Sequence, residues 1–289
     1  MRLIANAKVN WALSVLGKRE DGYHELDMVM QSVTLCDTLS IQPADSLLLR
    51  VRGAPVPASE KNLVLRAAKA LQTFCGVSYG AEFLLKKRIP IGGGLGGGSA
   101  DAAATLLGLN MLWDLRLNEK ELMQLALSCG ADVPFCLHGG AARVGGIGEK
   151  LQPFSSAHTH PLVIVQPCRG LSTPSVFSAF DALQHPPSNP DCGQVMRALA
   201  HGDAKALATS MGNVLEAAAV PARPEISACA QALEHFGALS AQMTGSGSAV
   251  IALFADAAAA ESARTRCARI WPHAFTAFTT TAGVLLCEA

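Results

Sequence analysis

Apolar and polar residues alternate close to the start of the chain. The odd positions from residue 5 to residue 13 are apolar, whereas Asn6, Lys8 and Asn10 between them are polar. A period of two predicts a β-strand, with every second side chain on the same face. We therefore expect Asn6, Lys8 and Asn10 to share one strand face, either as part of a site or simply facing solvent.

The rest of the first half alternates between strand and helix patterns. A turn-rich segment, 17–24, precedes strand-like runs at 28–35 and 38–42, which together predict an antiparallel meander. Apolar residues spaced as on one helix face predict a helix over 62–74. The run 81–85 predicts a strand that leads into a glycine-rich segment.

Two helices are expected after the glycine-rich segment. Residues 102–112 have a helical composition, and Asn118 with Glu121 forms a capping pair for a helix that Gly130 would end. Pro134 biases Val133 toward an extended backbone.

The second half is expected to begin after a turn-like stretch. Residues 153–161 lack a clear period, and beyond them 162–165 and 249–254 predict buried strands among alanine-rich helices. We therefore predict two domains, residues 1–156 and 157–289, which agrees with a length of 289 residues.

Composition narrows the class of protein. Lys and Arg together number 23, as do Asp and Glu, so the formal net charge of 0 argues against nucleic acid or an anionic membrane as the main partner. The nine cysteines include no Cys-x-x-Cys pair, and no apolar run approaches the length of a membrane span. The start of the chain does not read as a signal peptide. These features predict a cytoplasmic protein.

The segment Gly92-Gly-Gly-Leu-Gly-Gly-Gly-Ser99 is the first candidate for chemistry. Free backbone N–H groups and the start of a helix would suit a phosphate. The spacing also satisfies the dinucleotide-binding pattern, and a flexible turn would look the same. A Walker-type loop is excluded, because Ala100 and Asp101 follow Ser99 where that loop needs a different ending. Taken alone, the segment leaves phosphate binding and an ordinary turn both open.

Three motifs in order resemble those of the GHMP kinases, the superfamily of galactokinase, homoserine kinase and mevalonate kinase. They are Ala7-Lys-Val-Asn10, Pro90-Ile-Gly-Gly-Gly-Leu-Gly-Gly-Gly-Ser99-Ala-Asp-Ala-Ala and Met243-Thr-Gly-Ser-Gly-Ser-Ala-Val250. The resemblance implies a two-domain α+β fold with a mixed α/β ATP-binding domain, a ferredoxin-like C-terminal domain and an active site in the cleft between them.

The resemblance also implies the parts of a kinase site. ATP would be the phosphoryl donor, held by Pro90, Gly92, Gly93, Gly94, Leu95, Gly96, Gly97, Gly98 and Ser99. Asp132 would accept the proton of the substrate hydroxyl, and Lys8 would offset negative charge at the reacting oxygens. An aspartate is a weak base for an alcohol, so its contribution would be to orient the hydroxyl. A turn aspartate and a solvated strand lysine are the ordinary alternatives.

Three further segments resemble the branch of the family that phosphorylates an alcohol carried on cytidine diphosphate, a step of the non-mevalonate route to isoprenoid precursors. They are Asp21-Gly-Tyr-His24, Gly130-Ala-Asp-Val-Pro134 and Leu171-Ser-Thr-Pro174. This likeness implies a small-molecule substrate bearing cytidine diphosphate, bound by Asn10, Tyr23, His24, Thr173, Phe177, Gly245 and Gly247. Tyr23 would stack on the cytosine and His24 would hydrogen-bond to it. A core role for Phe177 and a plain turn at Gly245 stay open.

Magnesium is expected with ATP, and Ser99 resembles the serine that the family associates with the ion, although a helix N-cap would place serine there too. Members often have a serine doublet at this point, whereas here Gly98 precedes Ser99 and Ala100 follows it. The ion would then be held mostly by phosphates and water. Two other readings remain: a GHMP kinase acting on a smaller alcohol such as mevalonate or homoserine, and a binding protein without activity on the same fold.

Overall fold

The computed structural model describes residues 1–156 and 158–288. The strands are β1 (Arg2–Lys18), β2 (His24–Ala44), β3 (Leu47–Arg52), β4 (Gly80–Lys86), β5 (Ala141–Gly146), β6 (Lys150–Phe154), β7 (Pro161–Val165), β8 (Gly212–Asn213), β9 (Ser240–Met243), β10 (Val250–Leu253), β11 (Ala274–Thr280) and β12 (Val284–Glu288). The helices are α1 (Leu63–Cys75), α2 (Gly97–Leu112), α3 (Glu119–Cys129), α4 (Val133–His138), α5 (Thr173–Asp181), α6 (Cys192–His201), α7 (Ala204–Ser210), α8 (Glu216–Ala219), α9 (Glu225–His235) and α10 (Ala257–Cys267).

Two long strands connect the halves of the molecule. β1 and β2 pair antiparallel along almost their whole length, and the main path of the sheet runs β12-β1-β2-β11-β7-β10-β9. β4 and β5 pair with opposite ends of β2, which extends the sheet on the N-terminal side. β11 joins β2 to β7 and so carries the sheet into the C-terminal half.

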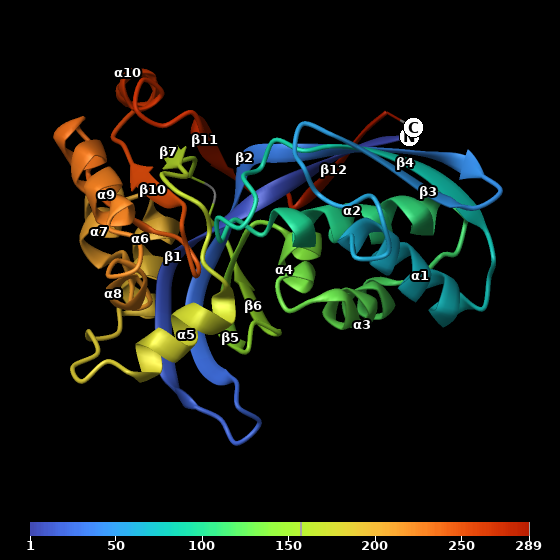
Figure 1. Cartoon of the computed structure of the whole chain (residues 1–289), viewed down its shortest axis with the longest axis horizontal. Helices are drawn as coiled ribbons and strands as arrows, with labels where there is room; N and C mark the ends of the chain where they lie inside the picture. Colours follow the sequence, from blue (N-terminus) through green and yellow to red (C-terminus); the bar gives the residue numbers. More distant parts are fainter. Residues whose placement is uncertain (157, 289) are drawn as a thin grey trace.

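The helices gather at the two ends of this sheet, as Figure 1 shows. α1, α2, α3 and α4 lie together beneath the strands of the N-terminal half, and α6 to α10 lie with β7, β9 and β10 at the other end. Each end has its own apolar core. Phe83 and Leu106 belong to the first, and Phe254 and Leu233 belong to the second. This agrees with the expected mixed α+β fold.

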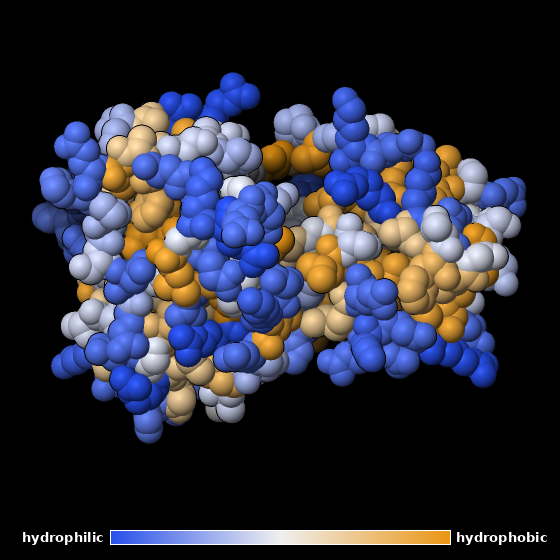
Figure 2. Space-filling model, turned by 90° about the horizontal axis from the view of Figure 1, so that it is seen from below, coloured by the Kyte–Doolittle hydropathy of each residue, from blue (hydrophilic) through white to orange (hydrophobic). Residues whose placement is uncertain are grey.

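The last strand returns to the start of the chain. β12 pairs antiparallel with β1, so the marked N and C ends lie together in Figure 1. The domain boundary expected after residue 156 stays a prediction. If the chain is divided there, β12 returns from the second half to pair with β1 in the first. None of the helices in the described residues is long and apolar enough to cross a bilayer. The surface in Figure 2 mixes hydrophilic and apolar residues and is hollowed between the two halves.

Local patterns predicted several elements correctly. The helix expected over 62–74 is α1, with Asn62 as its N-cap, and Asn118 and Glu121 form the expected capping box at the start of α3. Gly130 follows the last residue of α3 as predicted.

Two local expectations were wrong. The runs 28–35 and 38–42 belong to one strand, β2, because Asp37 between them is buried and is held by hydrogen bonds from the backbone N–H groups of Arg88 and Ile89. Val133 is not extended but begins α4, since proline at the second position of a helix has no N–H bond to lose.

Candidate active site

The glycine-rich segment forms a turn that ends in a helix. Gly96 is the N-cap of α2 in a left-handed conformation (φ 68°), and the helix begins at Gly97. Ser99 is therefore inside the first turn and is not the N-cap that the sequence allowed as an alternative. The unpaired N–H groups of this turn and the positive end of the helix dipole are suited to an anion.

Two loop positions have room only for glycine. A Cβ on Gly96 would lie 2.9 Å from Cγ of Lys8, and a Cβ on Gly94 would lie 2.3 Å from the carbonyl oxygen of Thr244. Both residues also have positive φ, which L side chains adopt at a cost. Close approach of the loop to β1 and to the C-terminal half is thus the physical reason for glycine at these positions.

The second glycine-rich segment, 244–247, is fixed against β1 and the first loop. The Oγ1 of Thr244 accepts a hydrogen bond from the backbone N–H of Asn10 (2.9 Å), and Gln242 donates to the carbonyl of Asn10 (3.1 Å). Gly245 approaches Gly94 so closely that a Cβ would lie 2.9 Å from its carbonyl oxygen. The two segments, which are far apart in the chain, therefore meet where Gly94 faces Gly245.

Lys8 and Asp132 form an ion pair at this junction. The Nζ of Lys8 lies 3.4 Å from Oδ2 of Asp132 and donates to Oδ1 of Asn10 (3.0 Å). The backbone of Lys8 also donates to the carbonyl of Leu95 (3.0 Å), which ties β1 to the glycine loop. Lys8 is only 5% exposed and Asn10 is fully buried, so the solvated strand face considered from the sequence is wrong for both.

The backbone sets the position of Asp132, without a capping hydrogen bond from its side chain. It is the N-cap of α4, yet its carboxylate makes no capping hydrogen bond, which leaves it free to face Lys8. The side chain is 35% exposed, compared with 6% for Lys8. A buried cation thus lies beside a carboxylate that a ligand can reach.

Two cavities meet at the glycine loop. The first, of about 380 Å³, is lined by the loop and by Val56, Pro57, Lys61, Asn62, Leu63 and Lys87. The second, also about 380 Å³, contains Lys8, Asn10 and Asp132. Gly92, Gly94, Gly96 and Ser99 line both cavities. The sequence did not indicate that residues in the segment 56–63 line the first cavity, because the loop before α1 contains no recognisable motif.

The far wall of the second cavity contains several of the expected substrate residues. Thr173, Phe177, Gly245 and Gly247 line it, and Oγ1 of Thr173 lies 2.9 Å from Oγ of Ser246. Phe177 stacks on His24, with ring centroids 4.7 Å apart. The sequence did not indicate Ser246 in this wall.

Tyr23 and His24 differ in their surroundings. His24 is largely buried, and its Nε2 lies 2.6 Å from Oδ1 of Asp181, which also pairs with Lys18 (2.7 Å). These two partners lower the pKa of Asp181, Lys18 having the larger effect. Tyr23 is 61% exposed, at the turn between β1 and β2, and is not part of the cavity wall. Asp181 was missed because it follows the Thr173 segment without a motif.

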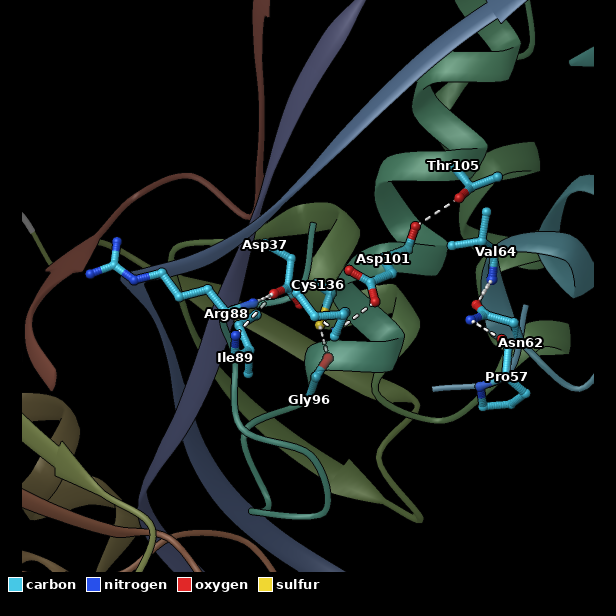
Figure 3. A network of polar contacts seen from close by, with 11 residues as sticks. Asp37, Pro57, Asn62, Val64, Arg88, Ile89, Gly96, Asp101, Thr105 and Cys136 are labelled. Carbon is cyan, nitrogen blue, oxygen red and sulfur yellow. Dashed lines mark hydrogen bonds and ion pairs between the residues drawn. The ribbon is translucent and has the colours of Figure 1, made fainter. Parts of the chain in front are cut away.

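A buried charged network fixes both ends of the glycine loop. Lys87 pairs with Asp37 and, at 2.6 Å, with Asp101. Figure 3 shows Asp37 between the Arg88–Ile89 segment that enters the loop and Asp101. Lys87 directly follows β4, the strand before the loop, whereas Asp37 belongs to β2 and Asp101 to α2, so the network joins both strands to the helix after the loop.

The network contains two carboxyl groups for one ammonium group. Burial raises the pKa of Asp101, Lys87 opposes this rise, and the nearby Asp37 adds to it. Burial alone would lower the pKa of Lys87, but Asp101 and Asp37 together raise it. The Oδ1 of Asp101 is buried without a hydrogen-bond partner in the described structure. Asp37 belongs to no motif recognised from the sequence, and Asp101, although it lies in the glycine-rich motif, was assigned no role there.

Side chains offer little to a magnesium ion. The described residues contain no group of three or more His, Cys, Asp or Glu that could hold a metal. Ser99 lines both cavities, and its hydroxyl is the protein oxygen expected near the phosphates. This donor set fits Mg²⁺ that keeps most of its water and phosphate ligands.

Known proteins resemble the chain over nearly its whole length. Residues 62–140 match the N-terminal domain model of the GHMP kinases, and residues 195–273 match the C-terminal model. The 4-diphosphocytidyl-2-C-methyl-D-erythritol kinase of Pelotomaculum thermopropionicum is 46% identical, with 92% of each chain covered. The chain belongs to this family of GHMP kinases.

Solved structures agree with this assignment. The crystal structure of a 4-(cytidine 5′-diphospho)-2C-methyl-D-erythritol kinase matches with a TM-score of 0.83 and 36% identity, covering 96% of this chain and 99% of that one. Homoserine kinase from Cytophaga hutchinsonii shares the fold, with a TM-score of 0.74, 19% identity and coverage of 99% and 96%. The expected GHMP fold is confirmed, and the protein is a small-molecule kinase of the family that uses ATP as phosphoryl donor.

Proposed function

We propose that the protein transfers the terminal phosphoryl group of ATP to the 2-hydroxyl of 4-diphosphocytidyl-2-C-methyl-D-erythritol, giving the 2-phosphate and ADP in the non-mevalonate route to isoprenoid precursors. The family relationship supports this substrate. The decisive observation within the chain is that the two cavities share the glycine loop, with Lys8 and Asp132 lining the second. A phosphate on the loop would face a hydroxyl beside Asp132.

The first cavity is proposed to hold ATP. The loop residues from Gly92 to Ser99 present N–H groups to its phosphates, and the segment 56–63 encloses the nucleotide on the opposite side. Mg²⁺, where bound, would supply charge neutralisation at the phosphates, with Ser99 as the protein residue nearest to it. The glycine loop then needs no side chain to bind the phosphates.

Asp132 is proposed to orient the acceptor hydroxyl and receive its proton. In a loose transition state the proton moves late, so position is more important than basicity. Lys8 would stabilise negative charge on the transferring oxygens. Because Asn10 fixes the Lys8 ammonium at 3.0 Å, this charge is already in place before substrate binds.

The cytidine end is proposed to lie along the wall formed by Thr173 and Phe177. His24 supports Phe177 from behind through ring stacking, and Asp181 fixes His24. Tyr23 is exposed next to His24 and would close over the base from the turn between β1 and β2. Gly245 and Gly247 allow close backbone approach near the transferred phosphate.

A substrate panel tests this proposal. Purified protein with ATP and Mg²⁺ is offered 4-diphosphocytidyl-2-C-methyl-D-erythritol, its uridine analogue, mevalonate and homoserine, and ADP release is measured. We expect turnover with the first compound and much weaker turnover with the uridine analogue. Preference for mevalonate or homoserine would assign the protein to another GHMP activity, and no turnover with any of them would favour a binding protein.

A further inference from the structure

A third cavity adjoins the glycine loop and is larger than the two cavities of the active site. Its volume is about 670 Å³. It shares Lys87 and the residues 89–92 with the nucleotide cavity. Its other walls come from 53–55, 166–172 and 272–273, which do not line the nucleotide cavity. The mechanism proposed above does not use it.

Three basic side chains from distant parts of the chain converge on this cavity. Arg88 follows β4, Arg169 lies between β7 and α5, and His273 lies between α10 and β11. Lys87 also lines the cavity, but its ammonium group is already engaged by Asp37 and Asp101. The three convergent groups are therefore counted without Lys87.

These groups lack acidic partners. None of Arg88, Arg169 and His273 takes part in an ion pair within the described part of the chain, and the lining residues include no carboxylate. A concave surface with unpaired guanidinium groups focuses the field on an anion inside it.

Arg88 is held in a defined direction. Its backbone N–H donates to Oδ1 of the buried Asp37, while its guanidinium lies 5.9 Å from the centre of the Phe275 ring. Figure 3 shows the Arg88 side chain extended away from Asp37 and Asp101. The backbone anchor fixes the start of the side chain, and the ring contact favours a guanidinium directed away from the two aspartates.

We propose that this cavity binds a small ligand bearing a phosphate or diphosphate group, while the nucleotide occupies its own cavity. Guanidinium groups bind phosphate oxygens through paired, charge-assisted hydrogen bonds, and Arg88 and Arg169 supply two such groups from facing segments. His273 adds a ring N–H donor. The ligand is separate from ATP and from the acceptor alcohol, so the proposal stands apart from the proposed function.

Calorimetric titration with inorganic pyrophosphate tests the site. The titration is carried out on the full chain saturated with the non-hydrolysable analogue AMP-PNP, at constant free Mg²⁺, so that the glycine loop is already occupied. We expect one equivalent of pyrophosphate to bind. The double variant Arg88→Ala/Arg169→Ala should weaken binding about 100-fold, and Arg169→Ala alone about 10-fold, from the usual strength of charge-assisted hydrogen bonds.

The controls separate this site from the nucleotide site and from general charge effects. Arg197→Ala removes an exposed guanidinium on α6, outside the cavity, and should leave binding unchanged. Arg169 is exposed in a connecting segment, so its single variant keeps the test valid even if the double variant folds poorly. Pyrophosphate binding that is seen without AMP-PNP and is abolished by it would show that the cavity belongs to the nucleotide site. That result, no binding, or equal binding by Arg169→Ala and the unaltered chain would overturn the proposal.

Discussion

At the scale of single residues, Lys8 is expected to contribute to both folding and chemistry, whereas Asp132 is expected to contribute mainly to chemistry. Lys8 is buried and has fixed contacts to Asn10 and Asp132, so removing it would also leave buried acceptors without a partner. Asp132 is partly exposed and makes no capping bond, so its loss should affect chemistry with little effect on folding. Asp132 is therefore the more informative position for a test of mechanism.

Asp132→Asn is expected to lower kcat by about 10²–10⁴-fold, because the amide can neither receive the proton nor orient the hydroxyl in the same way. Affinity for AMP-PNP, measured by calorimetry, should change little, since Asp132 does not line the nucleotide cavity. Asp114→Asn is the control, because Asp114 is an exposed turn residue paired with Arg116. A kcat close to that of the unaltered protein would remove Asp132 from the mechanism.

Tyr23→Ala is expected to raise KM for the cytidyl substrate about 10-fold or more, if the ring stacks on the base, while KM for ATP stays the same. Steady-state kinetics with each substrate varied in turn gives both values. The other tyrosine, Tyr79, is a matched control. It is similarly exposed (52%), but it packs beside Trp113 and lines neither active-site cavity. Equal changes in both KM values would argue against stacking.

At the scale of elements, the glycine loop is fixed by its neighbours and not by flexibility. Lys8 bonds to the loop at Leu95, Gly93 accepts from Ala249, and Cys136 lies 3.9 Å from the carbonyl of Gly96. Strand β1, helix α4 and the second glycine segment therefore hold the loop from three sides. A phosphate site formed by backbone N–H groups requires such support, because the binding groups must be in place before the ligand arrives.

Gly96→Ala and Gly76→Ala distinguish backbone strain from steric contact. Both glycines have left-handed φ values, 68° and 65°, so each alanine should cost about 1 kcal/mol of stability. Only at Gly96 would the new Cβ meet another group, Cγ of Lys8 at 2.9 Å, whereas nothing lies within 4 Å at Gly76. We expect Gly96→Ala alone to raise KM for ATP and lower kcat.

Urea unfolding and steady-state kinetics on both variants provide the comparison. A larger loss of stability in Gly96→Ala than in Gly76→Ala, with a kinetic defect confined to Gly96→Ala, is expected. Unaltered kinetics in Gly96→Ala would mean that the contact between the loop and Lys8 does not position the phosphates.

At the scale of the whole molecule, the buried network of Asp37, Lys87 and Asp101 should link stability to pH. The pKa of Asp101 is raised in the folded protein by burial, so the folded state keeps a proton that the unfolded chain releases above about pH 4. The contribution of Asp101 to the free energy of unfolding is fully present below about pH 4. It is lost as pH rises, until Asp101 ionises in the folded protein too. Burial of Glu216 raises the pKa of that group too and adds a contribution of the same sign.

Asp101→Asn should therefore make the free energy of unfolding fall less steeply between about pH 5 and about pH 8. Urea titrations at several pH values measure this slope. Asp114→Asn, in an exposed turn, should keep the slope of the unaltered protein. Identical slopes for the Asp101 variant and the unaltered protein would contradict a protonated Asp101 in the folded state.

Sequence patterns were sufficient where the physical cause is local. The period of two around Lys8 predicted a strand, and Asn118 with Glu121 predicted a capped helix, because pleating and helix capping involve residues only a few positions apart. The glycine loop itself was ambiguous until its likeness to a family was added. Its resemblance to the GHMP kinases then indicated ATP, Lys8 and Asp132 before any contact was known.

The tertiary structure decided what depends on residues distant in the chain. Burial of Lys8 and Asn10 arises because other segments cover the polar face of β1, which a strand pattern alone does not reveal. The partners of His24 and Lys87 are separated from them by 157 and by 14 or 50 residues, with no motif to join them. Local periodicity thus determined several elements and the family motifs determined the kind of chemistry, whereas long-range packing determined which charges are paired and which remain free for a ligand.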